Sequence, residues 1–184
     1  MVIQVRNTDQ SWGVISIGIH WLVAIIVIGL FGLGLWMTSL SYYDAWYTQG
    51  PYVHKSIGVL LFALMVVRLL WRLVNTPTMP LPNHATWEKT VAHVVHLALY
   101  VLLFATMISG YLISTADGRE IEVFHWFEVP AFTLGIEQQA DIAGTIHFYL
   151  AVSLTSLVVL HAAGALKHHF LDKDDTLKRM LRTN

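Results

Sequence analysis

Four histidines lie near the ends of long apolar stretches, and they are the side chains of this chain best placed to do chemistry. They are His20, His54, His147 and His161. A side chain that ionises or binds a metal is costly in hydrocarbon, so a histidine in a membrane-spanning segment predicts a function. Imidazole is a common axial ligand of haem iron. Each histidine alone could equally be a structural hydrogen-bonding residue, so the prediction depends on how the four are arranged.

The composition indicates which elements must position these histidines. Of the 184 residues 55% are hydrophobic and only 12% are charged, which is far from the average of soluble domains. Four apolar stretches have the ~20 residues needed to cross a bilayer as helices, and they cover residues 14–37, 53–73, 91–113 and 143–166. We therefore predict an all-α integral membrane protein, a single domain over residues 1–184 that forms a four-transmembrane-helix bundle.

The distribution of basic residues predicts the orientation of this bundle. With a cytoplasmic N-terminus, nine of the eleven Lys and Arg residues lie on the inner side, and only Lys55 and Arg119 lie outside. Cytoplasmic loops carry such an excess of positive charge. The sequence thus predicts a multi-pass membrane protein, in contact with lipid, with both termini cytoplasmic and no nucleic-acid partner.

This topology pairs the four histidines by depth. His20 and His161 both lie near the inner surface, whereas His54 and His147 both lie near the outer surface. His147 and His161 are fourteen residues apart on one helix, which is roughly 21 Å along the axis and within about 40° around it. One helix can therefore present a ligand to each of two b haems enclosed by the bundle. The absence of cysteine excludes thiolate-ligated haem, covalent c-type haem and iron–sulfur clusters.

Neighbouring residues favour the same interpretation. Gly58, Gly144 and Gly164 each share a helix face with one of the histidines, where they would let a flat porphyrin approach the backbone, although small residues also serve ordinary helix packing. Arg68 lies fourteen residues after His54 and is the predicted partner of a haem propionate; the alternative is that it extends to the interface.

The remaining histidines and the loops have less specific interpretations. His96, with His93 three residues before it, is expected near a quinone or a haem propionate, the alternative being an interfacial polar role. His168 and His169 are expected to contact propionates, quinone or lipid headgroups, whereas loop residues His84 and His125 are not expected to be ligands. Residues 123–127 of the long acidic outer loop are apolar enough to lie along the membrane, and a short helix is one form that they could take.

None of the four predicted spans contains Asp or Glu. Proton pumps and cation transporters usually need carboxylates within the membrane. A di-iron carboxylate site in the bundle is excluded because no Glu-x-x-His lies there. The pattern therefore favours the movement of electrons over the movement of ions.

At these residues the chain resembles the bacterial cytochrome b561 family, four-helix di-haem inner-membrane cytochromes that include superoxide oxidase. Five motifs carry the resemblance, which covers nearly the whole chain: residues 17–21 (IGIHW), 54–58 (HKSIG), 65–69 (MVVRL), 92–97 (AHVVHL) and 161–169 (HAAGALKHH). Three further segments are most similar to the YceJ-type branch of the family: residues 40–44 (LSYYD), 109–118 (SGYLISTADG) and 167–178 (KHHFLDKDDTLK).

The resemblance implies a function as well as a fold. It implies that His20 and His161 hold the inner haem, that His54 and His147 hold the outer haem, and that electrons are exchanged with ubiquinone, as a substrate or a bound cofactor. We expect electron transfer between a periplasmic donor protein and the ubiquinone pool, with superoxide:ubiquinone oxidoreductase as an alternative. A haem-bearing anchor subunit of a partner oxidoreductase is a further alternative, and a non-redox haem binder or sensor a more remote one.

The outer loops bear on the choice between these functions. An enzyme that collects superoxide benefits from a positive outer surface. Here the first outer loop has no Lys or Arg, and the second has one Arg against six carboxylates. Lys55, beside His54, is the local positive charge expected to act at the outer haem.

Overall fold

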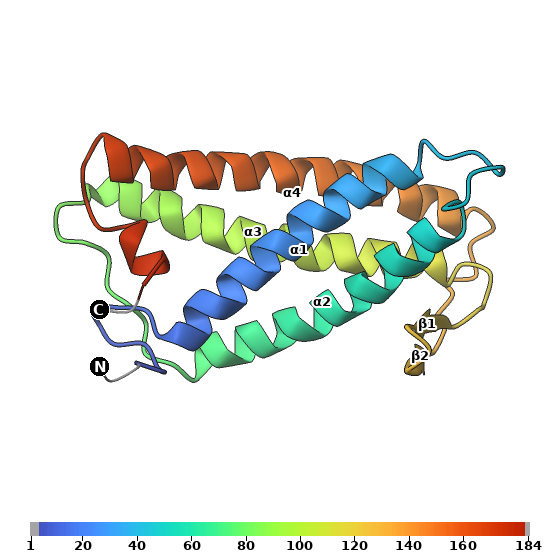
Figure 1. Cartoon of the computed structure of the whole chain (residues 1–184), viewed down its shortest axis with the longest axis horizontal. Coiled ribbons are helices and arrows are strands. Elements are labelled where there is room, and N and C mark those ends of the chain that lie inside the picture. The colour runs from blue at the N-terminus through green and yellow to red at the C-terminus, as the bar shows by residue number, and fades with distance from the viewer. Residues whose placement is uncertain (1–3, 183–184) are drawn as a thin grey trace. The chain divides into compact units, whose positions relative to one another are not determined.

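The chain, as a computed structural model that describes residues 4–182, consists mainly of four long helices (Figure 1). The helices are α1 (Val14–Met37), α2 (Gln49–Leu73), α3 (Thr86–Ser114) and α4 (Gln139–Phe170). All four are long and apolar enough to cross a membrane. The predicted all-α membrane architecture is therefore confirmed.

Three of the helices begin earlier than hydropathy alone predicts. α2, α3 and α4 start four or five residues before the apolar stretches at 53, 91 and 143. At the start of α3, the Glu88 carboxylate accepts a hydrogen bond of 2.9 Å from the backbone N–H of Ala85, which satisfies a donor that the helix leaves open. Glu88 and Asp141 consequently lie in the first turns of helices, outside the predicted apolar stretches.

The segment between α3 and α4 forms a β-hairpin, so the short helix considered for residues 123–127 is wrong. β1 (Ile121–Val123) pairs antiparallel with β2 (Phe127–Val129). Phe124 and His125 have φ values of 48° and 58°, and the Trp126 N–H donates to the Val123 carbonyl at 2.8 Å. Two successive positive φ values form the turn that matches the twist of a hairpin. In the sequence, the alternation of apolar residues with Glu122 and Glu128 is the pattern that indicates these two strands.

The chain divides into two compact units, and each contains a segment of every long helix. Unit 1 comprises Met1–Ala24, Leu64–Leu99 and Ser156–Asn184, and unit 2 comprises Ile25–Ala63 and Tyr100–Thr155. In unit 2, Leu61, Leu103 and Leu154 are buried from three different helices, and Val123 of β1 is fully buried. In unit 1 the buried residues include Val23 of α1 and Met65 of α2.

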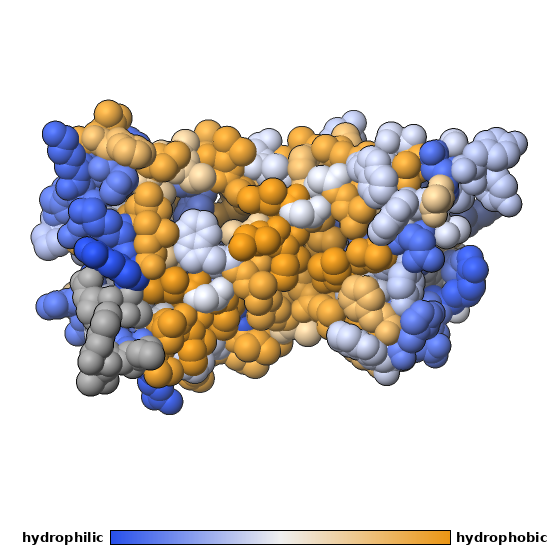
Figure 2. Space-filling model, in the orientation of Figure 1, coloured by the Kyte–Doolittle hydropathy of each residue, from blue (hydrophilic) through white to orange (hydrophobic). Residues whose placement is uncertain are grey.

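Large apolar side chains also cover the outer faces of the helices. On the face shown in Figure 2, hydrophobic side chains lie over the helices and hydrophilic ones gather around their ends. Ile25, Val159 and Leu160 are each more than 60% exposed. Aliphatic surface of this kind is stable in contact with lipid acyl chains.

Candidate functional site: two histidine pairs

Unit 1 brings together His20 from α1 and His161 from α4. The centres of their rings lie 6.3 Å apart, with the ring planes 63° from parallel. His96 from α3 joins them, with its ring centre 5.2 Å from that of His161. Three of the four long helices thus each place one imidazole in the same region of unit 1.

The remaining long helix, α2, adds a positive charge to this cluster. The guanidinium Nη2 of Arg68 from α2 lies 3.0 Å from Nδ1 of His20. A guanidinium has donors only, so in this contact Nδ1 accepts the hydrogen bond. The structure therefore places two residues predicted to contact the cofactor, Arg68 and His96, beside the pair formed by His20 and His161.

Unit 2 brings together His54 from α2 and His147 from α4. Their ring centres lie 6.2 Å apart, with the planes 73° from parallel. Nδ1 of His147 lies 2.9 Å from the backbone carbonyl oxygen of Thr106 and 3.1 Å from the hydroxyl of Ser109, both on α3. Because a carbonyl only accepts, His147 carries its proton on Nδ1 and keeps the lone pair of Nε2 for a metal.

The spacing of both pairs fits two axial ligands of one iron ion. A bond from a metal to an imidazole nitrogen is about 2 Å long, so two nitrogens on one ion lie roughly 4 Å apart and the ring centres about 6 Å apart. The observed separations of 6.3 and 6.2 Å agree with this expectation. Both pairs therefore have the donor chemistry and the spacing that a bis-histidine haem requires.

Two glycines on facing helices make room for the rings in unit 2. A Cβ atom on Gly110 of α3 would lie 3.1 Å from Cε1 of His147, and one on Gly34 of α1 would lie 3.4 Å from Cε1 of His54. Sequence reasoning missed both, because it considered only glycines on the same helix as each histidine. The three glycines that it did consider are in open positions, where an added Cβ would meet no neighbouring atom within 4 Å. They are Gly58, Gly144 and Gly164.

Two other residues predicted to contact the cofactor have different surroundings. Lys55 follows His54 on α2 and is half-buried. His168, at the end of α4, packs against His84 with ring centres 4.5 Å apart and lies within 3.3 Å of a carboxylate oxygen of Asp174. The structure thus brings His168 to a separate polar cluster, together with a loop histidine that was not expected to act as a ligand.

The two units differ strongly in charge. Unit 1 holds nine Lys and Arg against five Asp and Glu, whereas unit 2 holds two against seven. On the hairpin of unit 2, a hydrogen bond with Glu120 and the repulsion between the two charges raise the pKa of Glu128. Unit 2 therefore presents a surface that repels anions, as expected from its acidic loop.

Comparison with known proteins supplies an independent line of evidence. The family model described as prokaryotic cytochrome b561 matches residues 11–183. The chain is 58% identical to cytochrome b561 homolog 2 of Escherichia coli K12 over 175 residues, which is 95% of this chain and 93% of that protein. It is 32% identical to the probable superoxide oxidase CybB of Yersinia pestis over 178 residues, which is 94% of this chain and 96% of that protein.

Proposed function

The chain belongs to the prokaryotic cytochrome b561 family and is a membrane b-type cytochrome of electron transfer, and from this premise we propose that it carries electrons from a periplasmic donor to the ubiquinone pool. It does so across the bacterial inner membrane, with both termini in the cytoplasm. The proposal rests on one observation above all: each unit holds one pair of histidines at the spacing of two ligands on one iron.

The proposed sites are as follows. His20 and His161 hold one haem b in unit 1, near the cytoplasmic surface, and His54 and His147 hold a second haem b in unit 2, near the periplasmic surface. One-electron transfer at moderate potential is the chemistry that such an iron centre supplies. The whole chain acts as a single domain around the two groups.

The residues around each pair have distinct roles in this proposal. In unit 2, the Thr106 carbonyl orients His147 and keeps its Nε2 available. In unit 1, ligation through Nε2 of His20 would place its proton on Nδ1, and Nδ1 would then no longer accept from the Arg68 guanidinium. A haem propionate would be a suitable acceptor for this guanidinium, because a charge-assisted hydrogen bond of this kind is strong where water is scarce. His96 lies beside the same pair and contacts a propionate or the quinone.

The test is a haem count combined with a quinone assay. We expect about two haems per chain by pyridine haemochrome, both low-spin and six-coordinate, and we expect ubiquinol to reduce the protein reconstituted in liposomes. A haem count near one, or a five-coordinate spectrum, contradicts the pairing. A full count without reduction by quinol would leave the haem sites intact and remove the quinone from the proposal.

Superoxide:ubiquinone oxidoreductase is the second candidate, favoured by the likeness to the probable superoxide oxidase of Yersinia pestis. Lys55 is the local positive charge beside His54 that could attract the anion. The seven carboxylates of unit 2 oppose its approach. Stopped-flow mixing with superoxide, with and without quinone, separates an oxidase from an electron carrier that takes its electrons from a protein. Co-purification would instead reveal a membrane anchor for a partner oxidoreductase.

A further inference from the structure

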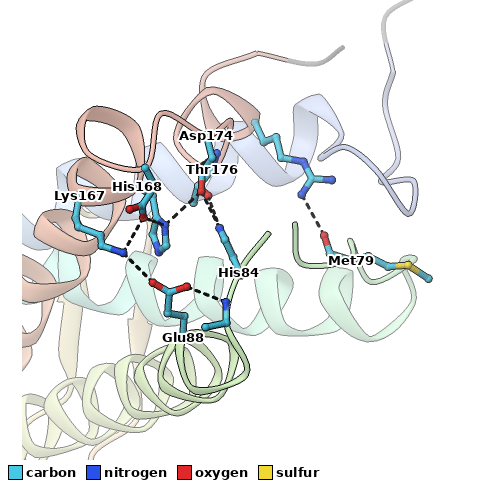
Figure 3. A network of polar contacts seen from close by, with 10 residues as sticks. Met79, His84, Glu88, Lys167, His168, Asp174 and Thr176 are labelled. Atoms are coloured by element: carbon cyan, nitrogen blue, oxygen red, sulfur yellow. Dashed lines mark hydrogen bonds and ion pairs between the residues drawn. The ribbon is translucent and has the colours of Figure 1, made fainter. Parts of the chain in front are cut away.

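A second group of histidines lies in unit 1, apart from the residues that surround His20 and His161. It consists of His84, from the loop between α2 and α3, His168, from the last turn of α4, and Asp174, from the segment that follows α4 (Figure 3). Nε2 of His84 lies 2.8 Å from Oδ2 of Asp174, and Nδ1 of His168 lies 3.3 Å from the same oxygen. The loop between α2 and α3 and the region around the end of α4, which are distant in sequence, therefore meet at one carboxylate oxygen.

This carboxylate is buried, and its charge needs compensation. The side chain of Asp174 is 6% exposed, and those of His84 and His168 are 14% and 17% exposed. Within residues 4–182, the ion pairs of Asp174 are with these two imidazoles. A buried charge is stable only when it is paired and hydrogen-bonded. Either a proton on a histidine or a bound cation must therefore balance Asp174.

The carboxylate of Asp174 is held with one oxygen directed to the histidines. The backbone N–H of Thr176 donates to Oδ1 at 2.8 Å, which leaves Oδ2 facing the two rings. The backbone thus fixes the orientation of this carboxylate toward the two imidazoles.

The adjacent acidic residues already have a cation. Nζ of Lys167 lies 2.8 Å from Glu88 and 2.7 Å from Asp172 (Figure 3 draws its bond to Glu88). The group formed by Glu88, His168 and Asp172 also has atoms spaced for a metal, but Lys167 already forms an ion pair with each of its two carboxylates. Within residues 4–182, Asp174 is not among the ion-pair partners of this lysine, so its charge needs a different partner.

We propose that His84, His168 and Asp174 form a binding site for a divalent transition-metal ion of the zinc class. The three ligand atoms lie within 4.8 Å of one another. Bonds of about 2.0–2.1 Å in tetrahedral geometry place ligand atoms roughly 3.3 Å apart, close to the 2.8 and 3.3 Å observed. Two imidazoles and one carboxylate form a donor set that suits zinc and its neighbours and leaves a position for water.

A second observation supports the proposal. Nδ1 of His168 is buried and makes no hydrogen bond of acceptable geometry, although it lies 2.7 Å from Oδ2 of Asp172. A buried polar atom without a hydrogen bond is rare in native proteins and indicates a missing partner. A metal ion at this point would satisfy it. The ion would also join the α2–α3 loop, the end of α4 and the segment after it.

The test uses the full haem-loaded protein in detergent. It measures zinc rather than total metal, so that haem iron is not counted. We expect about one equivalent of zinc to remain in competition with a chelator. Asp174→Asn keeps the shape of the side chain and should weaken zinc binding by at least about tenfold, an effect that loss of an outer hydrogen bond to a metal ligand can already produce. His84→Ala should do the same. The matched control is Asp175→Asn, which changes the adjacent carboxylate, paired at 2.9 Å with Lys178.

Two results would overturn the metal site. One is the absence of stoichiometric zinc from the wild-type protein; the other is equal zinc affinity in wild type and Asp174→Asn, which would mean that other histidines bind the ion. If a variant loses its haem spectrum and is not folded, zinc-edge X-ray absorption of the wild-type protein decides instead. We expect two imidazole nitrogens and carboxylate oxygen at about 2.0–2.1 Å, whereas a shell of oxygen alone refutes the site.

Discussion

In unit 1 the ring centres of His20 and His161 lie 6.3 Å apart, and in unit 2 those of His54 and His147 lie 6.2 Å apart. The surroundings of these two similar pairs differ. His20 lies against the Arg68 guanidinium, whereas His147 lies against a backbone carbonyl. Unit 1 has an excess of basic residues and unit 2 an excess of acidic ones.

This difference gives the proposed electron transfer a direction. Ferric haem carries one more positive charge than ferrous haem, so positive surroundings favour the reduced form and negative surroundings the oxidised form. We therefore expect the haem of unit 1 to have the higher midpoint potential. Electrons would then move from the periplasmic haem to the cytoplasmic one.

The largest expected effect is the loss of a whole haem, and it tests whether the two pairs are separate sites. His161→Ala should reduce the haem count from about two to about one per chain, and His147→Ala should do the same with loss of the other spectral component. His20→Ala should match His161→Ala, and His54→Ala should match His147→Ala. Reduced-minus-oxidised spectra of the four variants measure this. Loss of the same component in His20→Ala and His54→Ala would contradict the pairing.

A smaller expected effect tests whether the charges around the two haems cause a difference between their midpoint potentials. Arg68→Gln removes one positive charge beside His20 and should lower the potential of the unit 1 haem by on the order of 50–100 mV, at an effective dielectric constant of about 20. Redox titration of both haems measures the shift. Arg68→Lys keeps the charge and should keep most of the potential. Lys55→Gln is the matched change in unit 2 and should move the other haem; a shift of both haems by either variant would refute the assignment.

Glycine substitutions test the packing that holds the rings of unit 2. Gly110→Ala places a Cβ 3.1 Å from His147, and overpacking of this kind costs typically 1–3 kcal/mol. We expect an altered spectrum and earlier thermal loss of the unit 2 haem. Gly34→Ala, with a closest distance of 3.4 Å, should have a weaker effect. Gly32→Ala, where a Cβ meets nothing within 4 Å, is the control and should leave both haems unchanged.

The smallest expected effect concerns superoxide. Because acidic residues predominate in unit 2, the rate of reaction with superoxide should be low and should change little, or rise, as salt increases. Pulse-generated superoxide at low and high ionic strength measures it. A nearly diffusion-limited rate that falls steeply with salt would show effective electrostatic attraction of the anion. Superoxide oxidase would then become the leading function.

Much of the site could be derived from positions along the chain. Hydropathy located four spans, and the depth of each histidine in its span paired His20 with His161 and His54 with His147. The structure places the rings of these same pairs at adjacent positions, while their role as ligands stays a prediction. Depth is predictable because a helix rises by a constant ~1.5 Å per residue and a membrane fixes where its ends lie.

The contacts around each ring depended on the tertiary structure. The sequence does not show that the Thr106 carbonyl meets His147, that Gly34 and Gly110 face the rings, or that loop residue His84 reaches Asp174. Each of these contacts depends on the rotation of one helix against another or on the path of a loop. Side-chain packing over many residues decides both. Composition and spacing along this chain therefore determined the kind of protein and the depth of its histidines, and only packing decided what each imidazole touches.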